Sequence, residues 1–236
     1  MQPPPSLPAQ LYLLAYDLER NRMYRSPYLG RALRAAAATE LYRAGLLTDE
    51  NGRVKPVAPR AEHRPHAEGR PGQPAAPGRR RTPTADELCA QLISEVGASS
   101  RHRSWKHWVN KNQRTAGRVV RDQLEAGRWI RVERRRILGM IPATSVTVRD
   151  RAMVRRLHRE VEQVLHGGPA GRADPGPASL AALLAAGQIG AMKSGRARRA
   201  LKGRLALLEP VAGPAVPALR AAVREAQTAE SAGAAG

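Results

Sequence analysis

The hydrophobic residues of this chain recur at helical spacing over most of its length. In residues 7–18 the apolar side chains lie about one turn apart, which predicts a short amphipathic helix. Residues 17–26 are polar and strongly charged, which predicts a loop that carries Arg20, Arg22 and Arg25. A longer helix is expected to begin near Pro27 and to end near Gly45, because Pro favours the first turn of a helix and Gly the position just past the last turn. The same spacing predicts further helices over residues 84–96, 105–126, 150–165, 178–192, 195–208 and 217–229. Asp150 is expected to cap the helix over 150–165.

The helix predicted between Pro27 and Gly45 should have two unlike faces. Its apolar face consists of Leu29, Leu33, Ala36, Ala37 and Ala44. Its opposite face carries Arg31, Arg34, Ala38 and Tyr42. Glu40 falls within the apolar face, where an ionised carboxylate needs a cation or several N–H donors. We interpret Glu40 as half of a structural buried ion pair rather than as a catalytic group.

One part of the chain has the composition of paired strands. Residues 129–133 and 141–148 are rich in β-forming side chains and flank three successive arginines and Gly139, so they predict a hairpin over about 129–148. Thr84 and Glu87 have the spacing of a capping box and should begin the helix that follows them. The predicted fold class is therefore mainly α, with one β-hairpin.

Composition divides the chain into regions of different character. Residues 52–81 are rich in Pro, Gly, Arg and His and nearly lack aliphatic side chains, which predicts a disordered basic insertion. Residues 1–51 and 82–228 are then two parts of one domain, and the Ala- and Gly-rich residues 229–236 are a disordered tail. Aromatic residues make up only 3% of the chain and Phe is absent, which suits close packing of helices better than a β-sandwich.

Several functional classes are disfavoured. Cys89 is the only cysteine, so an intrachain disulfide and a cysteine metal cluster are excluded. Its apolar neighbours favour a small core residue over a nucleophile. The apolar runs are far shorter than the ~20 residues of a membrane span, and the first residues lack the features of a signal peptide, so we expect a cytoplasmic protein. The common hydrolase, zinc-protease and nucleotide-binding motifs are missing and the histidines lack ligand spacing, so we expect neither an enzyme nor a bound cofactor or metal.

Charge is the strongest functional signal in the sequence. Forty Lys and Arg residues stand against twenty Asp and Glu residues, which leaves a net charge of +20 and attracts polyanions such as nucleic acid or an anionic membrane. One group of arginines precedes or lies on the first long helix: Arg22, Arg25, Arg31 and Arg34. A second group shares one stripe of a later helix: Arg114, Arg118 and Arg121. Because Arg grips phosphate through a fork of N–H donors, the two groups would form a phosphate site if they converged.

Four segments, in this order, resemble the Golgi phosphoprotein 3 family. They are residues 7–17 (LPAQLYLLAYD), residues 30–47 (GRALRAAAATELYRAGLL), residues 82–88 (TPTADEL) and residues 124–127 (LEAG), followed by the hairpin and a Leu-rich helical pair. The resemblance spans nearly the whole chain apart from residues 52–81, and it implies a helical core from which the hairpin protrudes. The high content of Ala, Arg, Gly and Pro favours a bacterial member over a Golgi one.

The resemblance also implies a ligand. Eukaryotic members of the family are peripheral membrane proteins that bind phosphatidylinositol 4-phosphate and act as adaptors for glycosyltransferase tails. They hold the headgroup with a Trp, one Arg on the first long helix and two Arg on a later helix. Here the first-helix Arg falls on Arg34 and the Trp position on Arg25, while the later pair falls near Gln113 and Ala116, next to Arg114 and Arg118. The candidate headgroup-binding residues are Arg25, Arg34, Arg114 and Arg118.

Our first hypothesis is a peripheral membrane protein at the cytoplasmic face of a membrane that binds an anionic headgroup, with phosphatidylinositol 4-phosphate as the first candidate. An adaptor role for an unidentified protein client is left open. The alternative is a nucleic-acid-binding protein, because the basic helix over 111–121, a turn at Gly127 and a hairpin that carries residues 134–136 imitate a winged helix. Self-association through the hairpin would need exposed Trp129, Ile137, Ile141 and Val146, whereas ordinary packing would bury half of them.

Overall fold

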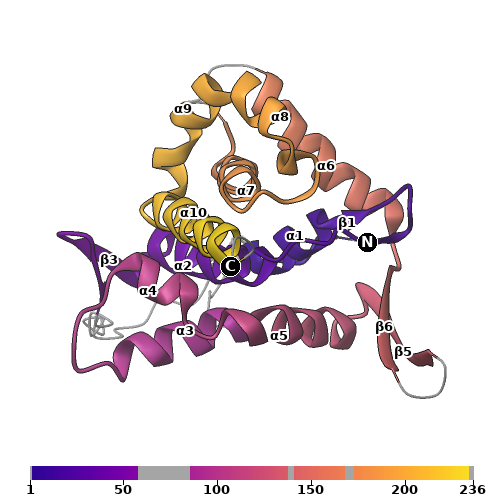
Figure 1. Cartoon of the computed structure of the whole chain (residues 1–236), viewed down its shortest axis with the longest axis horizontal. Helices are drawn as coiled ribbons and strands as arrows, with labels where there is room; N and C mark the ends of the chain where they lie inside the picture. The colour runs from indigo at the N-terminus through magenta and orange to yellow at the C-terminus, as the bar shows by residue number, and fades with distance from the viewer. Residues whose placement is uncertain (1, 58–85, 138–140, 168–172, 234–236) are drawn as a thin grey trace, which may run out of the picture.

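Helix α2 (Leu29–Arg43) runs through the middle of the protein between two groups of helices (Figure 1). The computed structural model describes residues 2–57, 86–137, 141–167 and 173–233. Helix α1 (Leu7–Leu14) packs beside α2. One side of this pair is covered by α3 (Glu87–Gly97), α4 (Trp105–Asn110) and α5 (Gln113–Ala126). The other side is covered by α6 (Arg151–His166), α7 (Pro175–Ala186), α8 (Gly195–Ala200), α9 (Lys202–Ala212) and α10 (Ala215–Gly233).

The alanines of α2 explain its central position. Side chains as small as Ala let neighbouring helices approach closely on several sides, and α2 contacts α1, α3, α4, α5, α7 and α10. The helix is therefore buried nearly all round. The prediction of a polar face that includes Arg34 and Ala38 is wrong, because both side chains are buried, and Ala44, expected on the apolar face, is exposed.

Helix α1 is shorter and more buried than predicted. It ends at Leu14 instead of reaching residue 18, and all its residues except Gln10 are buried. The chain then forms a two-residue strand, β1 (Tyr16–Asp17), which pairs antiparallel with β2 (Arg22–Met23). Asn21 takes a left-handed backbone conformation (φ 53°) in the tight connection, as Asn does more readily than most residues. The region predicted as a polar loop is thus a small hairpin.

The start of the predicted insertion is ordered. Strand β3 (Leu47–Glu50) pairs with β4 (Arg53–Pro56) through a turn at Asn51 and Gly52, both with positive φ. Val54 is buried against the core, and its N–H donates to the Arg103 carbonyl at 2.9 Å, so packing and hydrogen bonds hold residues that composition assigned to disorder. Residues 58–81, the rest of the insertion, lie outside the described residues. So does Thr84, and the N-cap of α3 is Asp86, whose side chain accepts a hydrogen bond from the Cys89 N–H. Cys89 is fully buried, as its apolar neighbours predicted.

The single helix predicted over 105–126 is two helices. Lys111 is extended and Asn112 has a left-handed conformation (φ 54°), so α4 ends at Asn110 and α5 begins at Gln113. Helix α5 is amphipathic and buries Ala116, Val120 and Leu124. The break lets α4 and α5 point in different directions while both remain packed on α2.

The predicted hairpin is confirmed as β5 (Ile130–Ile137) paired antiparallel with β6 (Ile141–Val148), and it projects from the end of α5 (Figure 1). Its base packs inward: Ile130, Val132, Val146 and Val148 are buried, and Trp129 is partly buried. Val146 is therefore not an exposed contact for self-association, whereas the side chains of Ile137 and Ile141 lie outside the described residues. Self-association through the hairpin stays a prediction.

The carboxyl-terminal half closes the fold. Asp150 caps α6 by accepting a hydrogen bond from the Met153 N–H, as predicted. Helices α7 and α9 pack against each other, and a short 3-10 helix, η3 (Gly190–Lys193), leads from α7 into α8. Helix α10 continues to Gly233, so residues 229–233, expected to be a disordered tail, are helical. The prediction of a mainly α, single-domain fold with a β-hairpin is confirmed, and the two short hairpins β1–β2 and β3–β4 are additional to the one predicted.

Candidate functional site

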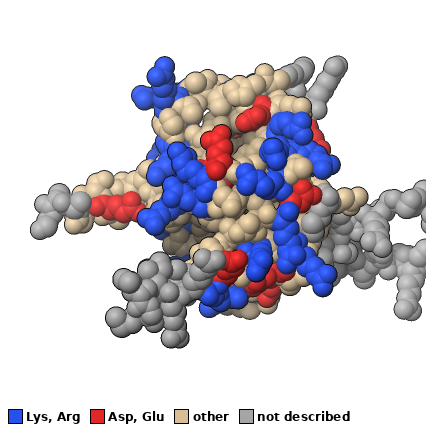
Figure 2. All heavy atoms as spheres, turned by 90° about the vertical axis from the view of Figure 1, so that its right-hand side faces the viewer, with Lys and Arg blue, Asp and Glu red and all other residues tan. Residues whose placement is uncertain are grey.

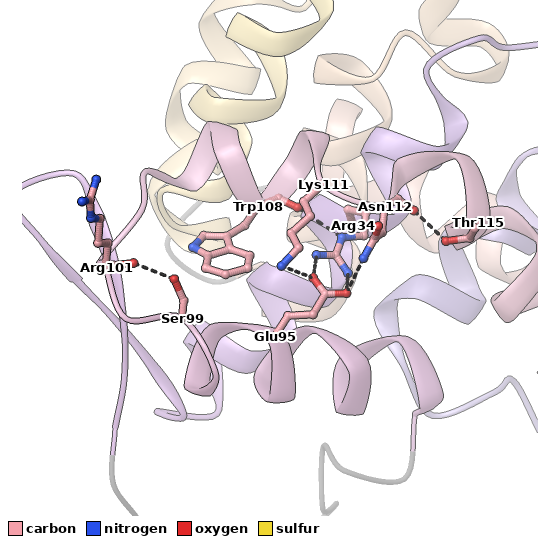
Figure 3. Close-up of polar contacts among 8 residues, drawn as sticks. All are labelled: Arg34, Glu95, Ser99, Arg101, Trp108, Lys111, Asn112 and Thr115. Carbon is pink, nitrogen blue, oxygen red and sulfur yellow. Dashed lines mark hydrogen bonds and ion pairs between the residues drawn. The ribbon is translucent and has the colours of Figure 1, made fainter.

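Arg34 is the most deeply buried cation in the described part of the chain, and it is fully paired (Figure 3). Its Nη2 and Nη1 lie 2.7 and 3.4 Å from the two carboxylate oxygens of Glu95, on α3. Its Nε donates to the backbone carbonyl of Trp108, on α4, at 3.1 Å. The side chain of Arg34 has no exposed surface, whereas that of Glu95 is 18% exposed, so the pair lies at the edge of the core.

The α4–α5 connection also supplies partners to the Glu95 carboxylate. The side-chain amide of Asn112 donates to Glu95 at 2.8 Å, and the Lys111 ammonium lies 4.0 Å from the same carboxylate. The Lys111 ammonium also lies 4.9 Å from the centre of the Trp108 ring, within cation–π range. The cluster therefore joins α2, α3 and the α4–α5 connection, and a buried arginine can be tolerated because its partners satisfy it. The geometry of this cluster indicates that it stabilises the fold by linking these elements.

The four arginines predicted to hold a headgroup differ in burial, and their joint binding of a headgroup stays a prediction. Arg34 is enclosed, whereas Arg114 and Arg118 on α5 and Arg25 before α2 are exposed. Within the described part of the chain, no hydrogen bond or ring contact joins any two of these four side chains. Helix α5 does reach the first turn of α2, since a Cβ added to Gly30 would lie 2.0 Å from the Gln113 carbonyl oxygen. The backbones of α2 and α5 are therefore in close contact at Gly30 and Gln113.

Arg25 lies in a different basic environment. It lines a small pocket between the β1–β2 hairpin and η3, together with Arg20, Arg22 and Lys193. The sequence predicted that the three arginines of this pocket share one loop, but it did not predict that Lys193 lies beside them. No signal in the sequence pointed to Lys193, since only the packing of η3 against Tyr24 brings the two segments together.

A hollow larger than the pocket beside Arg25 carries both signs of charge. It encloses about 640 Å³ between α1, α2, α6 and α7, and it is lined by Glu40, Glu160 and Asp174 as well as Arg43. The Glu40 carboxylate accepts a hydrogen bond from the Leu7 N–H at the first turn of α1, and Asp174 caps α7. Glu40 is partly buried and has a backbone N–H among its partners, while the ion pair predicted for it stays a prediction. With more carboxylates than cations, this hollow does not suit a polyanion.

Basic side chains dominate one face of the molecule. Figure 2 shows the side on which the β1–β2 hairpin, α6 and the β5–β6 hairpin lie in Figure 1, and Lys and Arg outnumber Asp and Glu across it. Exposed arginines of these elements include Arg20, Arg22, Arg131, Arg151, Arg155, Arg156 and Arg159. Basic side chains of elements from distant parts of the sequence therefore gather on one face, with a few acidic and many uncharged residues between them (Figure 2).

A helical domain with a strongly basic face belongs to the class of proteins suited to bind polyanions. A comparison with protein families matches residues 7–226 to the Golgi phosphoprotein 3 (GPP34) family. The match covers most of the chain, so the protein belongs to this family and the resemblance seen in the sequence is confirmed. A comparison with curated proteins finds no match. Among the described residues, no helix is both long and apolar enough to cross a lipid bilayer.

Proposed function

We propose that the protein is a peripheral membrane protein, without catalytic activity, that binds anionic phospholipid headgroups at the cytoplasmic face of a membrane. Phosphatidylinositol 4-phosphate is the first candidate ligand. The observation that carries the proposal is the basic face of Figure 2, on a chain that belongs to the Golgi phosphoprotein 3 family. A membrane surface is broad and negatively charged, and a basic face built from several elements complements it.

The exposed arginines would supply this affinity, and Arg34 would not. An arginine near an anionic bilayer contributes about 1 kcal/mol, and the contribution falls as salt shortens the screening length. Arg25, Arg114 and Arg118 are exposed and able to act in this way. Arg34 would contribute indirectly, by holding α2, α3 and the α4–α5 connection in place.

Vesicle co-sedimentation at near-physiological salt tests the proposal. The full chain is mixed with neutral liposomes, liposomes with a generic anionic lipid, and liposomes with phosphatidylinositol 4-phosphate at matched charge. We expect binding to both anionic preparations, reduced by added salt, and little binding to the neutral one. Equal sedimentation with neutral and anionic liposomes would overturn the proposal.

Nucleic acid remains the second candidate, because α5 and the hairpin form one unit. Arg134 on β5 forms an ion pair with Glu125 on α5 at 3.4 Å, which orients the hairpin against a helix whose Arg114 and Arg118 are exposed. Duplex DNA added as a competitor to the vesicle assay separates the two functions. We expect DNA to displace the protein only at low salt. Displacement by DNA at physiological salt, with weak vesicle binding, would favour the nucleic-acid function.

A further inference from the structure

The pocket beside Arg25 is small and has a clear excess of positive charge. It encloses about 170 Å³, and its polar lining includes Arg20, Arg22, Arg25, Lys193, Asp17 and Gln188. Four of these side chains are cationic and one is anionic, so the lining has a net charge of +3. Pockets for drug-sized molecules usually exceed about 300 Å³, so this one suits a single compact charged group.

The single carboxylate of the pocket is already occupied. Asp17 accepts hydrogen bonds from the backbone N–H groups of Glu19 and Arg20 and forms an ion pair with the Arg20 guanidinium, each at 3.0 Å. These bonds, led by the one from the Arg20 N–H, hold the pKa of Asp17 below its ordinary value. Among the described residues, Arg22, Arg25 and Lys193 have no ion-pair partner. Three cationic side chains are therefore available to a ligand.

The walls of the pocket are held in place by packing and by backbone hydrogen bonds. The Tyr24 N–H donates to the Ala15 carbonyl at 2.8 Å. Gly190 has φ +59°, and a Cβ added there would lie 3.4 Å from the Tyr24 ring, so the hairpin rests closely on η3. Arg198 donates to the carbonyls of Met192 and Lys193, which secures the end of η3. The arginines that carry the charge therefore project from a backbone that is already ordered.

The far side of the hairpin is anchored as well. Arg151 at the start of α6 donates to the Leu18 carbonyl and to the Asn21 side chain. The Tyr16 hydroxyl donates to the same Asn21 side chain at 2.7 Å. A site whose backbone is ordered before binding pays less ordering entropy when its ligand arrives.

We propose that this pocket binds a phosphate monoester through Arg22, Arg25 and Lys193, and that it is the part of the basic face that distinguishes a phosphorylated headgroup from other anionic lipids. The inference rests on the proposed membrane function. A monoester carries close to two negative charges and three acceptor oxygens, whereas the diester of an ordinary anionic lipid carries one charge. Three cations at the mouth of one small pocket match the monoester, and Arg supplies directed N–H donors to its oxygens.

Two matched double variants of the full chain test this assignment. Arg22→Gln with Arg25→Gln removes two charges from the pocket. Arg156→Gln with Arg159→Gln removes two exposed charges from α6, on the same basic face but outside the pocket. Each protein is titrated with soluble inositol 1,4-bisphosphate by calorimetry and with two vesicle preparations of equal charge, containing either phosphatidylserine or phosphatidylinositol 4-phosphate. Thermal unfolding confirms that both variants fold.

We expect the wild type to prefer the phosphoinositide vesicles and to bind the soluble bisphosphate. The pocket variant should bind the bisphosphate at least about tenfold more weakly, since charge-assisted hydrogen bonds are lost, and should lose the preference between vesicles. The α6 variant should keep both properties while binding all anionic vesicles somewhat less. Equal losses in the two variants, or a wild type that does not prefer the phosphoinositide, would overturn the pocket but leave the membrane function intact. Binding of the bisphosphate without binding of any vesicle would overturn the membrane function but leave the pocket intact.

Discussion

The two arginine-rich regions of this protein differ in one respect that matters more than the number of arginines: the partners of the guanidinium groups. Arg34 is fully buried and is matched by Glu95 and the Trp108 carbonyl. Arg22 and Arg25 are exposed and line a pocket whose only carboxylate already pairs with Arg20. Protein groups satisfy the first arginine, so it stabilises the fold. Arg22 and Arg25 have no ion-pair partner among the described residues, so they are available to bind a ligand.

The comparison also separates stability from binding. Removing one partner of a buried ion pair leaves an unpaired charge in a poorly solvated place, which is strongly destabilising. Removing an exposed arginine that lacks an ion pair changes the free energy of unfolding very little. Family membership alone would have placed Arg34 and the exposed arginines in the same functional class. The structure shows that Arg34 is buried and paired, whereas Arg22, Arg25, Arg114 and Arg118 are exposed.

The largest expected effect comes from removing Arg34. The substitution Arg34→Met leaves Glu95 at the edge of the core without its closest cation, and it should lower the free energy of unfolding by about 3–5 kcal/mol. Urea unfolding monitored by circular dichroism measures the loss. Arg118→Met is the matched control, because Arg118 is exposed, and it should change the value by less than about 0.5 kcal/mol. Similar losses in both variants would show that the buried pair has no special role.

A loss of similar size is expected when only the charge of Glu95 is removed. Glu95→Gln keeps an acceptor for one donor but leaves the fully buried guanidinium of Arg34 without its ionic partner, so we expect a loss of about 3–5 kcal/mol. The double variant Arg34→Met with Glu95→Gln should lose less than the sum of the single variants, because both belong to one network. Strictly additive losses in the same urea titration would argue against direct coupling.

The exposed stripe of α5 should show the opposite behaviour. Replacing Arg114 and Arg118 by Gln should leave the urea midpoint unchanged and weaken binding to anionic vesicles by about 1 kcal/mol per residue. Co-sedimentation over a series of salt concentrations measures the effect, which should shrink as salt rises. Unchanged vesicle binding at low salt would show that α5 does not contact the membrane and would favour the β1–β2 hairpin as the membrane-binding element.

The smallest effect concerns pH. Burial lowers the pKa of His158 below its ordinary value of 6.5, with Glu162 and the Tyr16 carbonyl partly opposing the shift. The folded state therefore prefers the neutral imidazole, and this contribution to stability is present above pH 6.5 and is lost as the pH falls through that value toward the lower folded pKa. His158→Gln should reduce the drop in melting temperature between about pH 7.5 and 5.5. The exposed His166→Gln control should leave the drop unchanged.

Local sequence predicted those features that depend on neighbouring residues. The periodic apolar positions of α5 and α6, the Asp150 cap and the β5–β6 hairpin were all predicted, because each depends on residues a few positions apart. The break at Asn112 was missed, since the apolar spacing continues across it and the stabilising bond from Asn112 goes to a distant residue, Glu95. Strand β4 was missed because the burial of Val54 depends on helices from elsewhere in the chain.

The sequence by itself determined the family, the mainly helical fold and the large positive charge, since these follow from local pattern, segment order and composition. Only the tertiary structure decided which cations are free. A guanidinium either is neutralised or faces solvent according to what packs against it, and the groups that decide this lie far away along the chain. Glu95 neutralises Arg34 across 61 positions, and the Lys193 side chain joins Arg25 in one pocket because η3 packs against the β1–β2 hairpin.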